Sequence, residues 1–227
     1  MYMKFSRLVM TSVIVLASLL ASSCSCSRKD DGASDETSSQ EAGDEEKDAS
    51  IMSDKWEKIN PEDLSMQPVK AFNKDWFALT VEASRNVNAM TISWGTIGEL
   101  WNKPVVIVYV SSSRASKRMM DRASTFTISA FPESFRNRES LAYIGSHSFD
   151  DEPEKIKNSG LTLEKTPEGA LTYKQASLVL QCKKIYSDDF KKNLMPSEIV
   201  KIYDNLGLHT FYIGEIISVW KRPEEGQ

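Results

Sequence analysis

Hydrophobic residues along this chain occur in short β-branched runs, and only a few stretches have helical spacing. Residues 105–110 (VVIVYV) and 125–131 (TFTISAF) carry no charge, so each is predicted to be a buried strand. Further strands are predicted at 75–84, 88–95 and 211–222, and a hairpin around Glu168 and Gly169 leads into a long strand. Short strands at even spacing, separated by glycine and proline turns, favour an antiparallel barrel.

The predicted helices are brief additions to these strands. One helical turn is expected at Pro61, and short helices are expected at 117–122, 138–144 and 154–159. A hairpin tip is predicted at 86–88 and a turn at 101–104, while Gly95 and Gly98 are expected to interrupt the strand pattern. The chain has no strand–helix alternation and no GxGxxG fingerprint, which argues against a Rossmann domain. The predicted fold class is mainly β with short helices.

The N-terminus resembles a bacterial lipoprotein signal. Lys4 and Arg7 precede an apolar run of about fourteen residues, which is too short for a comfortable membrane span. Small residues then lead to Cys24, although Ala21 stands where a lipobox more often has leucine. We therefore predict a signal peptide at 1–23 and lipidation of Cys24, which implies a bacterial cell envelope location at the periplasmic face or the cell surface. The alternatives are an ordinary cleaved signal and an uncleaved anchor.

An acidic segment follows the predicted signal. Residues 25–50 hold nine acidic side chains against three basic ones and almost no aliphatic side chain, so residues 24–50 are predicted to be a disordered tether. The remainder, 51–227, is predicted to be one domain and is electrically neutral. A neutral domain argues against nucleic acid as a partner. Its single cysteine, Cys182, lies in an apolar run and is expected to be a small buried residue.

A serine-rich loop between the two buried strands suits a phosphate group. Residues 111–116 (SSSRAS) place four hydroxyls around Arg114, just before a predicted helix start. Hydroxyls, a guanidinium and a helix N-terminus all favour a bound anion. The alternative is a polar hairpin loop. Only two histidines, His147 and His209, are present, so a metal site is not expected.

An ordered set of motifs resembles the flavin reductase-like family, the FMN-binding split β-barrels that include flavoredoxins. The resemblance covers about 75–220. It is carried by NAMTISWG (88–95), WNKPV (101–105), SRAS (113–116), STFTISAF (124–131), GSHS (145–148), KIKNSGL (155–161) and HTFYIGEI (209–216).

The resemblance implies a Greek-key split antiparallel β-barrel that binds one FMN per subunit, at or near a homodimer interface. It implies ring contacts from the strand at 88–93, a phosphate site in the serine loop, and a lid formed by residues around GSHS. The implied cofactor-binding residues are Asn88, Ala89, Met90, Thr91, Ser93, Ser113, Arg114, Ser116, Ser129, Phe131, Ser146, His147, Ser148, Lys155 and His209.

Two departures from the family pattern affect the expected chemistry. Many relatives have Arg-Pro where this chain has Ser111 and Ser112, and an aromatic residue where it has Ala115, so one cation is missing from the loop. Relatives also continue GSHS with Gly-Arg-Asp, whereas this chain has 149–151 as Phe-Asp-Asp. The loss of that cation weakens the case for an NAD(P)H site.

The predicted function is that of an FMN-binding oxidoreductase. It would accept a hydride or electrons on FMN, from NAD(P)H or a redox protein, and pass them to a flavin, a ferric chelate or a protein. A protein anchored outside the inner membrane does not meet cytosolic NAD(P)H, which favours a redox protein as donor. The alternative is a non-catalytic FMN-binding or structural surface lipoprotein.

Overall fold

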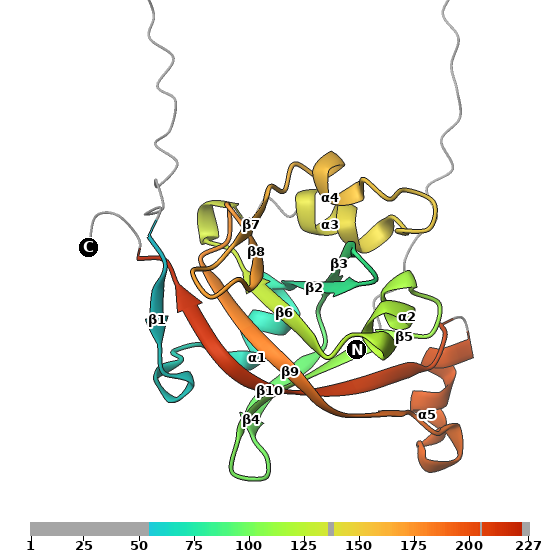
Figure 1. Cartoon of the computed structure of the whole chain (residues 1–227). Coiled ribbons are helices and arrows are strands. Elements are labelled where there is room, and N and C mark those ends of the chain that lie inside the picture. The colour runs from blue at the N-terminus through green and yellow to red at the C-terminus, as the bar shows by residue number, and fades with distance from the viewer. Residues whose placement is uncertain (1–54, 136–138, 205, 224–227) are drawn as a thin grey trace, which may run out of the picture. The chain divides into compact units, whose positions relative to one another are not determined.

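A computed structural model describes residues 55–135, 139–204 and 206–223, and its main feature is one large antiparallel sheet (Figure 1). Among these residues the sheet has eight strands, in the order β3-β2-β6-β9-β10-β5-β4 with β1 paired to β10, and β7 pairs with β8 separately. The strands are β1 (Glu57–Ile59), β2 (Phe77–Ala83), β3 (Asn86–Ile92), β4 (Gly95–Glu99), β5 (Pro104–Ser111), β6 (Thr125–Ala130), β7 (Leu163–Lys165), β8 (Leu171–Tyr173), β9 (Leu178–Asp189) and β10 (His209–Lys221).

The helices are all short. They are α1 (Pro68–Lys70), α2 (Ala115–Arg122), α3 (Glu139–Ser146), α4 (Lys155–Asn158) and α5 (Ser197–Val200), with single turns η1 (Pro61–Asp63), η2 (Ala71–Asp75), η3 (Glu133–Phe135), η4 (Lys192–Leu194) and η5 (Lys201–Asp204). Every ladder in the sheet is antiparallel. The structure confirms a mainly β fold with short helices.

The sheet curls into a barrel with an open seam. Its two edge strands, β3 and β4, are consecutive in the chain and are joined by only Ser93 and Trp94. The first and last strands of the sheet therefore meet at this link, although no ladder joins them. This seam is where the barrel is split.

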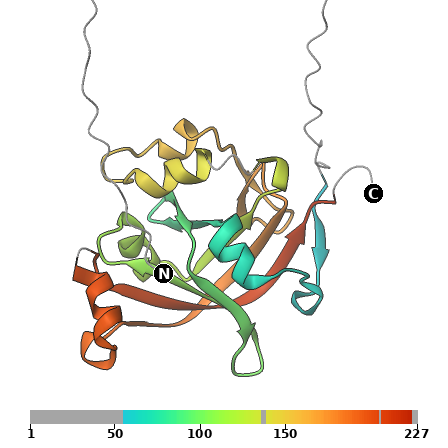
Figure 2. The same ribbon diagram turned by 180° about the vertical axis from the view of Figure 1, so that it is seen from behind.

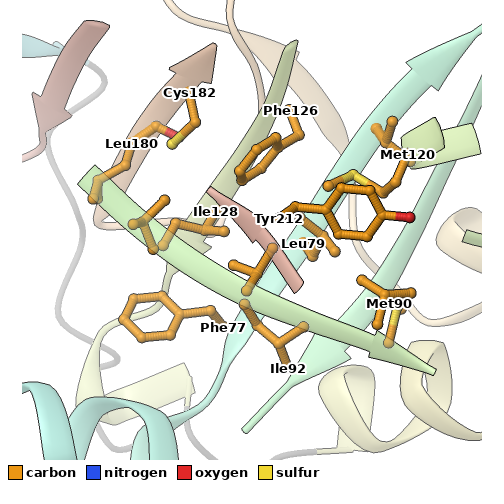
Figure 3. Packing of buried hydrophobic residues seen from close by; sticks show 14 of the residues in the cluster. Phe77, Leu79, Met90, Ile92, Met120, Phe126, Ile128, Leu180, Cys182 and Tyr212 are labelled. Carbon is orange, nitrogen blue, oxygen red and sulfur yellow. The ribbon is translucent and has the colours of Figure 1, made fainter. Parts of the chain in front are cut away.

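The barrel encloses the main hydrophobic core. Inward side chains of β2, β3, β5, β6, β9 and β10 form one buried cluster, part of which Figure 3 shows from close by. Gly214 of β10 allows the tight packing, because a Cβ there would lie 2.5 Å from the Phe126 ring. Cys182 lies in this cluster and is fully buried, as expected from the sequence. Burial raises the pKa of its thiol.

Short helices cover the open parts of the barrel. Figure 2 shows α1 and η2, where Phe72 packs into the core with its ring 4.8 Å from that of Phe77. On another side α3 lies against β3, and α4 lies beside α3 (Figure 1). A second buried cluster under these helices contains Ala89, Phe131, Leu141 and Tyr173.

Two turn predictions are wrong. The β2–β3 hairpin turns at Ser84 and Arg85, which adopt left-handed backbone angles, and residues 86–88 belong to β3. Gly95 and Gly98 do not interrupt the strand pattern but lie in strand β4. Gly95 is required there, since a Cβ would lie 2.3 Å from the Phe72 ring.

The predicted signal peptide, Cys24 and the acidic tether lie outside the described residues and stay predictions. Within the described residues, no helix combines the length and the apolar character needed to cross a membrane.

Candidate functional site

A cavity of about 310 Å³ opens at the seam of the barrel. Its walls come from β3 and the 93–94 link, the end of β5, the serine loop with the start of α2, the segment 146–155, and the start of β10. Twelve of the fifteen residues predicted from the sequence line it. These are Asn88, Met90, Thr91, Ser93, Ser113, Arg114, Ser116, Ser146, His147, Ser148, Lys155 and His209.

The serine loop forms one corner of the cavity. The Ser111 hydroxyl lies 3.0 Å from that of Ser113, and the Arg114 amide donates to the Ser111 carbonyl at 3.0 Å. Gly207 packs directly on this loop, and a Cβ there would lie 2.4 Å from the Ser112 hydroxyl. Because α2 begins at Ala115, the loop delivers its hydroxyls and guanidinium at a helix N-terminus.

Asn88 lies at the floor of the cavity. Its amide nitrogen donates to the Ser116 hydroxyl at 2.9 Å, which joins β3 to α2. Its oxygen Oδ1 is buried and has no hydrogen-bond partner among the described residues. A buried acceptor without a donor is costly, so this atom suits a ligand that brings one.

Two cations meet at the C-terminal end of α3. Arg114 Nη1 donates to the Gly145 carbonyl at 2.7 Å, and Lys155 Nζ donates to the carbonyls of Ile144 at 3.1 Å and His147 at 2.8 Å. The Lys155 side chain is almost fully buried. Its pKa is lowered to about 8, first by burial and then by the charge of Arg114, with Glu152 opposing both. The cavity thus holds the second cation that the serine loop itself lacks.

His147 belongs to a segment that we call the lid, residues 139–158. Its ring stacks on that of Tyr143, with centroids 3.8 Å apart. Its Nδ1 lies 3.0 Å from the Tyr143 carbonyl and 3.1 Å from the Ser146 hydroxyl. The Ser148 hydroxyl accepts from the Asp150 amide at 3.2 Å. These contacts fix the lid side chains along one edge of the cavity.

His209 closes the opposite edge. Its Nδ1 is buried without a partner in the part of the chain that the structure describes. Its pKa is lowered by burial and by the charge of Arg114, which favours the neutral ring at neutral pH. The ring lies 5.1 Å from that of Trp94 and 5.7 Å from that of Tyr203.

Three predicted residues do not line the cavity. Ala89 and Phe131 point into the second buried cluster, where Phe131 stacks on Phe135 at 5.3 Å. Ser129 is fully buried, and its hydroxyl lies 3.1 Å from that of Thr172.

The structure adds lining residues that the sequence did not single out for this role. Trp94 is 46% exposed and lines the cavity. The sequence signal for this role was its spacing, because Trp94 lies two residues after Ile92 and so on the same side of the strand. Leu206 is brought in from a distant segment and carried no signal. The full set of additions is Ile92, Trp94, Tyr109, Phe149 and Leu206, together with Ser111 and Ala115 of the predicted phosphate loop.

Of the two acids that follow GSHS, Asp150 and Asp151, one has a basic partner. Asp150 forms an ion pair with Arg118 of α2 at 2.5 Å, and both side chains are largely exposed. The structure therefore pairs one of the two acids with a cation from outside the motif.

The donor set fits FMN. A phosphate would meet Arg114, Lys155 and the serine hydroxyls, which are the groups that hold anions elsewhere. The unpartnered atoms of Asn88 and His209 suit the polar groups of a ribityl chain or a flavin ring. The cavity volume lies within the range of small-molecule sites. No cluster of three potential metal ligands occurs within 55–135, 139–204 and 206–223.

Solved structures with FMN-related descriptions share this fold. An FMN-binding domain of a flavin reductases-like enzyme from Shewanella baltica matches with a TM-score of 0.51 and 17% identity, over 74% of this chain and 77% of that chain. The FMN-binding protein of Thermus thermophilus with bound 1-cyclohex-2-enone matches with a TM-score of 0.51 and 19% identity, over 72% of this chain and 80% of that chain. The flavoredoxin of Desulfovibrio vulgaris matches with a TM-score of 0.50 and 22% identity, over 66% of this chain and 69% of that chain. At these identities the matches establish the fold, a split barrel. No curated protein matches the sequence significantly.

The family assignment rests on the sequence itself. The model of the flavin reductase like domain matches residues 71–227, which include every strand from β2 to β10 and the whole cavity. The chain belongs to the flavin reductase like domain family.

Proposed function

We propose that this chain binds FMN in the seam cavity and works as a flavin-dependent redox protein. The observation that carries the proposal is the convergence of Arg114 and Lys155 on one cavity that also contains the unpartnered Asn88 oxygen. Bound FMN would supply the chemistry, by accepting a hydride or electrons and passing them to a flavin, a ferric chelate or a protein.

The side chains of the protein bind and orient the cofactor. Arg114, Lys155 and the hydroxyls of Ser113 and Ser116 hold the phosphate. Asn88 Oδ1 accepts a hydrogen bond from the ribityl chain or the ring. The backbone of β3 would lie beside the flavin, while His147 and Trp94 would limit access to it.

We also propose a homodimer whose interface covers the mouth of the cavity. Trp94, Leu206 and Ile202 are each nearly half exposed, and Trp94 and Leu206 line the cavity itself. Exposed apolar groups beside a binding site are typical of interfaces. We expect analytical ultracentrifugation to give a dimer that Trp94→Glu converts to a monomer, whereas a monomeric wild-type protein would contradict the interface.

The electron donor is proposed to be NAD(P)H or a redox protein. Arg118, a cation that approaches the segment after GSHS, forms an ion pair with Asp150, and this favours the redox protein. An envelope location through lipidated Cys24 would favour it further. For the lipid anchor, we expect the wild type to incorporate a fatty-acid analogue and Cys24→Ser not to incorporate it.

Visible absorbance tests the cofactor. Purified protein incubated with FMN and passed over a desalting column should be yellow, and a colourless protein would overturn the proposal. NADH and NADPH are then added without oxygen. Bleaching identifies a reductase. A protein that only dithionite bleaches, and that then reduces ferric citrate or free flavin, is a carrier; one that reduces neither is the non-catalytic binding protein.

A further inference from the structure

We propose that Glu152 is a positioning residue that holds the lid so that His147 and Lys155 face the cofactor. The proposal rests on the proposed function for the identity of the cofactor, but its geometric part concerns the protein alone. Glu152 does not line the cavity, so it acts through the side chains that do.

Both carboxylate oxygens of Glu152 take part in contacts within the lid. Oε1 accepts from the Tyr143 hydroxyl of α3 at 2.7 Å and from the Asn158 amide of α4 at 2.5 Å. Oε2 lies 4.0 Å from His147 Nε2. One side chain therefore joins both helices of the lid and approaches the histidine between them.

The Glu152 backbone strengthens this junction. Its amide donates to the Ser148 carbonyl at 2.9 Å, and its carbonyl accepts from the Lys155 amide at 3.1 Å. These bonds keep residue 152 in place when its side chain is changed. Substitution of the side chain therefore tests the carboxylate without removing the turn.

Two routes lead from Glu152 to the cavity. The Tyr143 ring, held at its hydroxyl by Glu152, stacks on His147 with an angle of 11° between the rings. Lys155 donates to the His147 carbonyl and the Ile144 carbonyl, so its ammonium depends on the same lid geometry.

Charge provides a second link. Burial and the charge of Arg114, the residue before α2, lower the pKa of Lys155, and Glu152 raises it. The pKa of Glu152 is itself lowered, first by the Asn158 and Tyr143 hydrogen bonds and then by the charges of His147 and Lys155. Glu152 is therefore ionised at neutral pH and supports the charged form of Lys155.

Three variants separate these roles. Glu152→Gln keeps an acceptor for Tyr143 and Asn158 but removes the charge, and Glu152→Ala removes both. Glu154→Gln is the matched control, because Glu154 lies two residues away, is highly exposed and forms an ion pair with the exposed Lys157 at 3.7 Å. It removes the same charge without touching the junction.

The first measurement uses ligand-free protein. The chain has two histidines, so the His147 ring protons in the NMR spectrum can be assigned with His147→Gln. Stacking on Tyr143 shifts them upfield. We expect this shift to persist in Glu152→Gln and Glu154→Gln and to collapse toward the random-coil value in Glu152→Ala. An unchanged shift in Glu152→Ala overturns the geometric part, whether or not FMN binds.

The second measurement is FMN affinity against pH, by quenching of flavin fluorescence. We expect Glu152→Ala to bind about tenfold more weakly at pH 7, as expected for the loss of one or two hydrogen bonds. Glu152→Gln should move the alkaline decline in affinity to lower pH, while Glu154→Gln should follow the wild type. If Glu152→Gln and Glu154→Gln give the same profile of FMN affinity against pH, Glu152 does not act on Lys155 through its charge. If the wild-type protein binds no FMN, the proposed function is wrong. The first measurement still tests the role of Glu152 in the lid, because it needs no ligand.

Discussion

The barrel interior and the seam cavity share strand β3 but treat polar groups in opposite ways. Met90 and Ile92 belong to the core and also line the cavity. In the interior, the hydroxyl of the buried Tyr212 donates to Asp121 at 2.6 Å, so this polar group has its partner without a ligand. In the cavity, two cations face each other, and two of the four buried side-chain atoms found without a partner among the described residues are there.

The difference separates stability from binding. A side chain in the interior stabilises the fold through the apolar area that it buries. A polar side chain in the cavity gains its full set of partners only when a ligand is present. Core variants should therefore change unfolding, and cavity variants should change affinity.

Leu79→Ala should have the largest effect on stability. Leu79 is fully buried in the barrel, so its truncation should lower the free energy of unfolding by about 2–5 kcal/mol. Urea denaturation measures the loss. The FMN affinity of the protein that remains folded should stay close to that of the wild type. A large loss of affinity would show that packing in the core also determines binding in the cavity.

Arg114→Ala should have the largest effect on binding. The loss of a charge-assisted contact to phosphate should weaken FMN binding by about 1.5–3 kcal/mol, with little change in unfolding because the side chain is exposed. Isothermal titration calorimetry measures the affinity. Arg118→Ala, one turn into α2 and outside the cavity, serves as the control. Equal affinities for the two variants would place the phosphate elsewhere.

Alkaline pH should weaken binding through Lys155. The pKa of Lys155 is about 8 without ligand, and a nearby phosphate raises it because it favours the charged form. Binding therefore takes up a proton above pH 8, so affinity is full below that pH and falls on the order of tenfold for each unit above it. Titrations from pH 7 to 9 should show this decline in the wild type. Lys155→Met should bind weakly with a flat profile, and a decline that survives in this variant would exclude Lys155 as its source.

Ser116→Ala should have the smallest effect. It removes the acceptor for the Asn88 amide and should lower the free energy of unfolding by about 0.5–1.5 kcal/mol. Thermal denaturation compares it with Ser124→Ala, an exposed serine just beyond α2. A loss of stability no larger than that of the control would mean that the Asn88 amide finds another partner.

Local pattern predicted much of the fold. Uncharged β-branched runs marked β5 and β6, and Gly169 marked a hairpin turn where the structure has a left-handed backbone angle. Strand β4 was missed because Gly95 is needed for a contact with Phe72, which is distant in the sequence. Propensity rules assign glycine to turns and contain no information about such contacts.

The site was predictable where a motif lies on one segment. The serine loop and β3 line the cavity as the motifs indicated. Ser129 and Phe131 belong to the motif at 124–131, but their side chains point into other packing. The role of Lys155 as a second cation depends on the fold of α4 against α3, and the role of Glu152 depends on three separate contacts. No sequence spacing encodes these.

Strand β10 has a consequence for how the chain folds. It pairs with β1, β5 and β9, and its ladder with β5 joins His209 to Ser111, far apart in sequence. Contacts of such long range form slowly. Until β10 docks, the run VVIVYV of β5 exposes an uncharged, proline-free strand edge, which is the signature of an aggregation-prone segment. Docking of β10 is therefore the step that protects the nascent barrel from self-association.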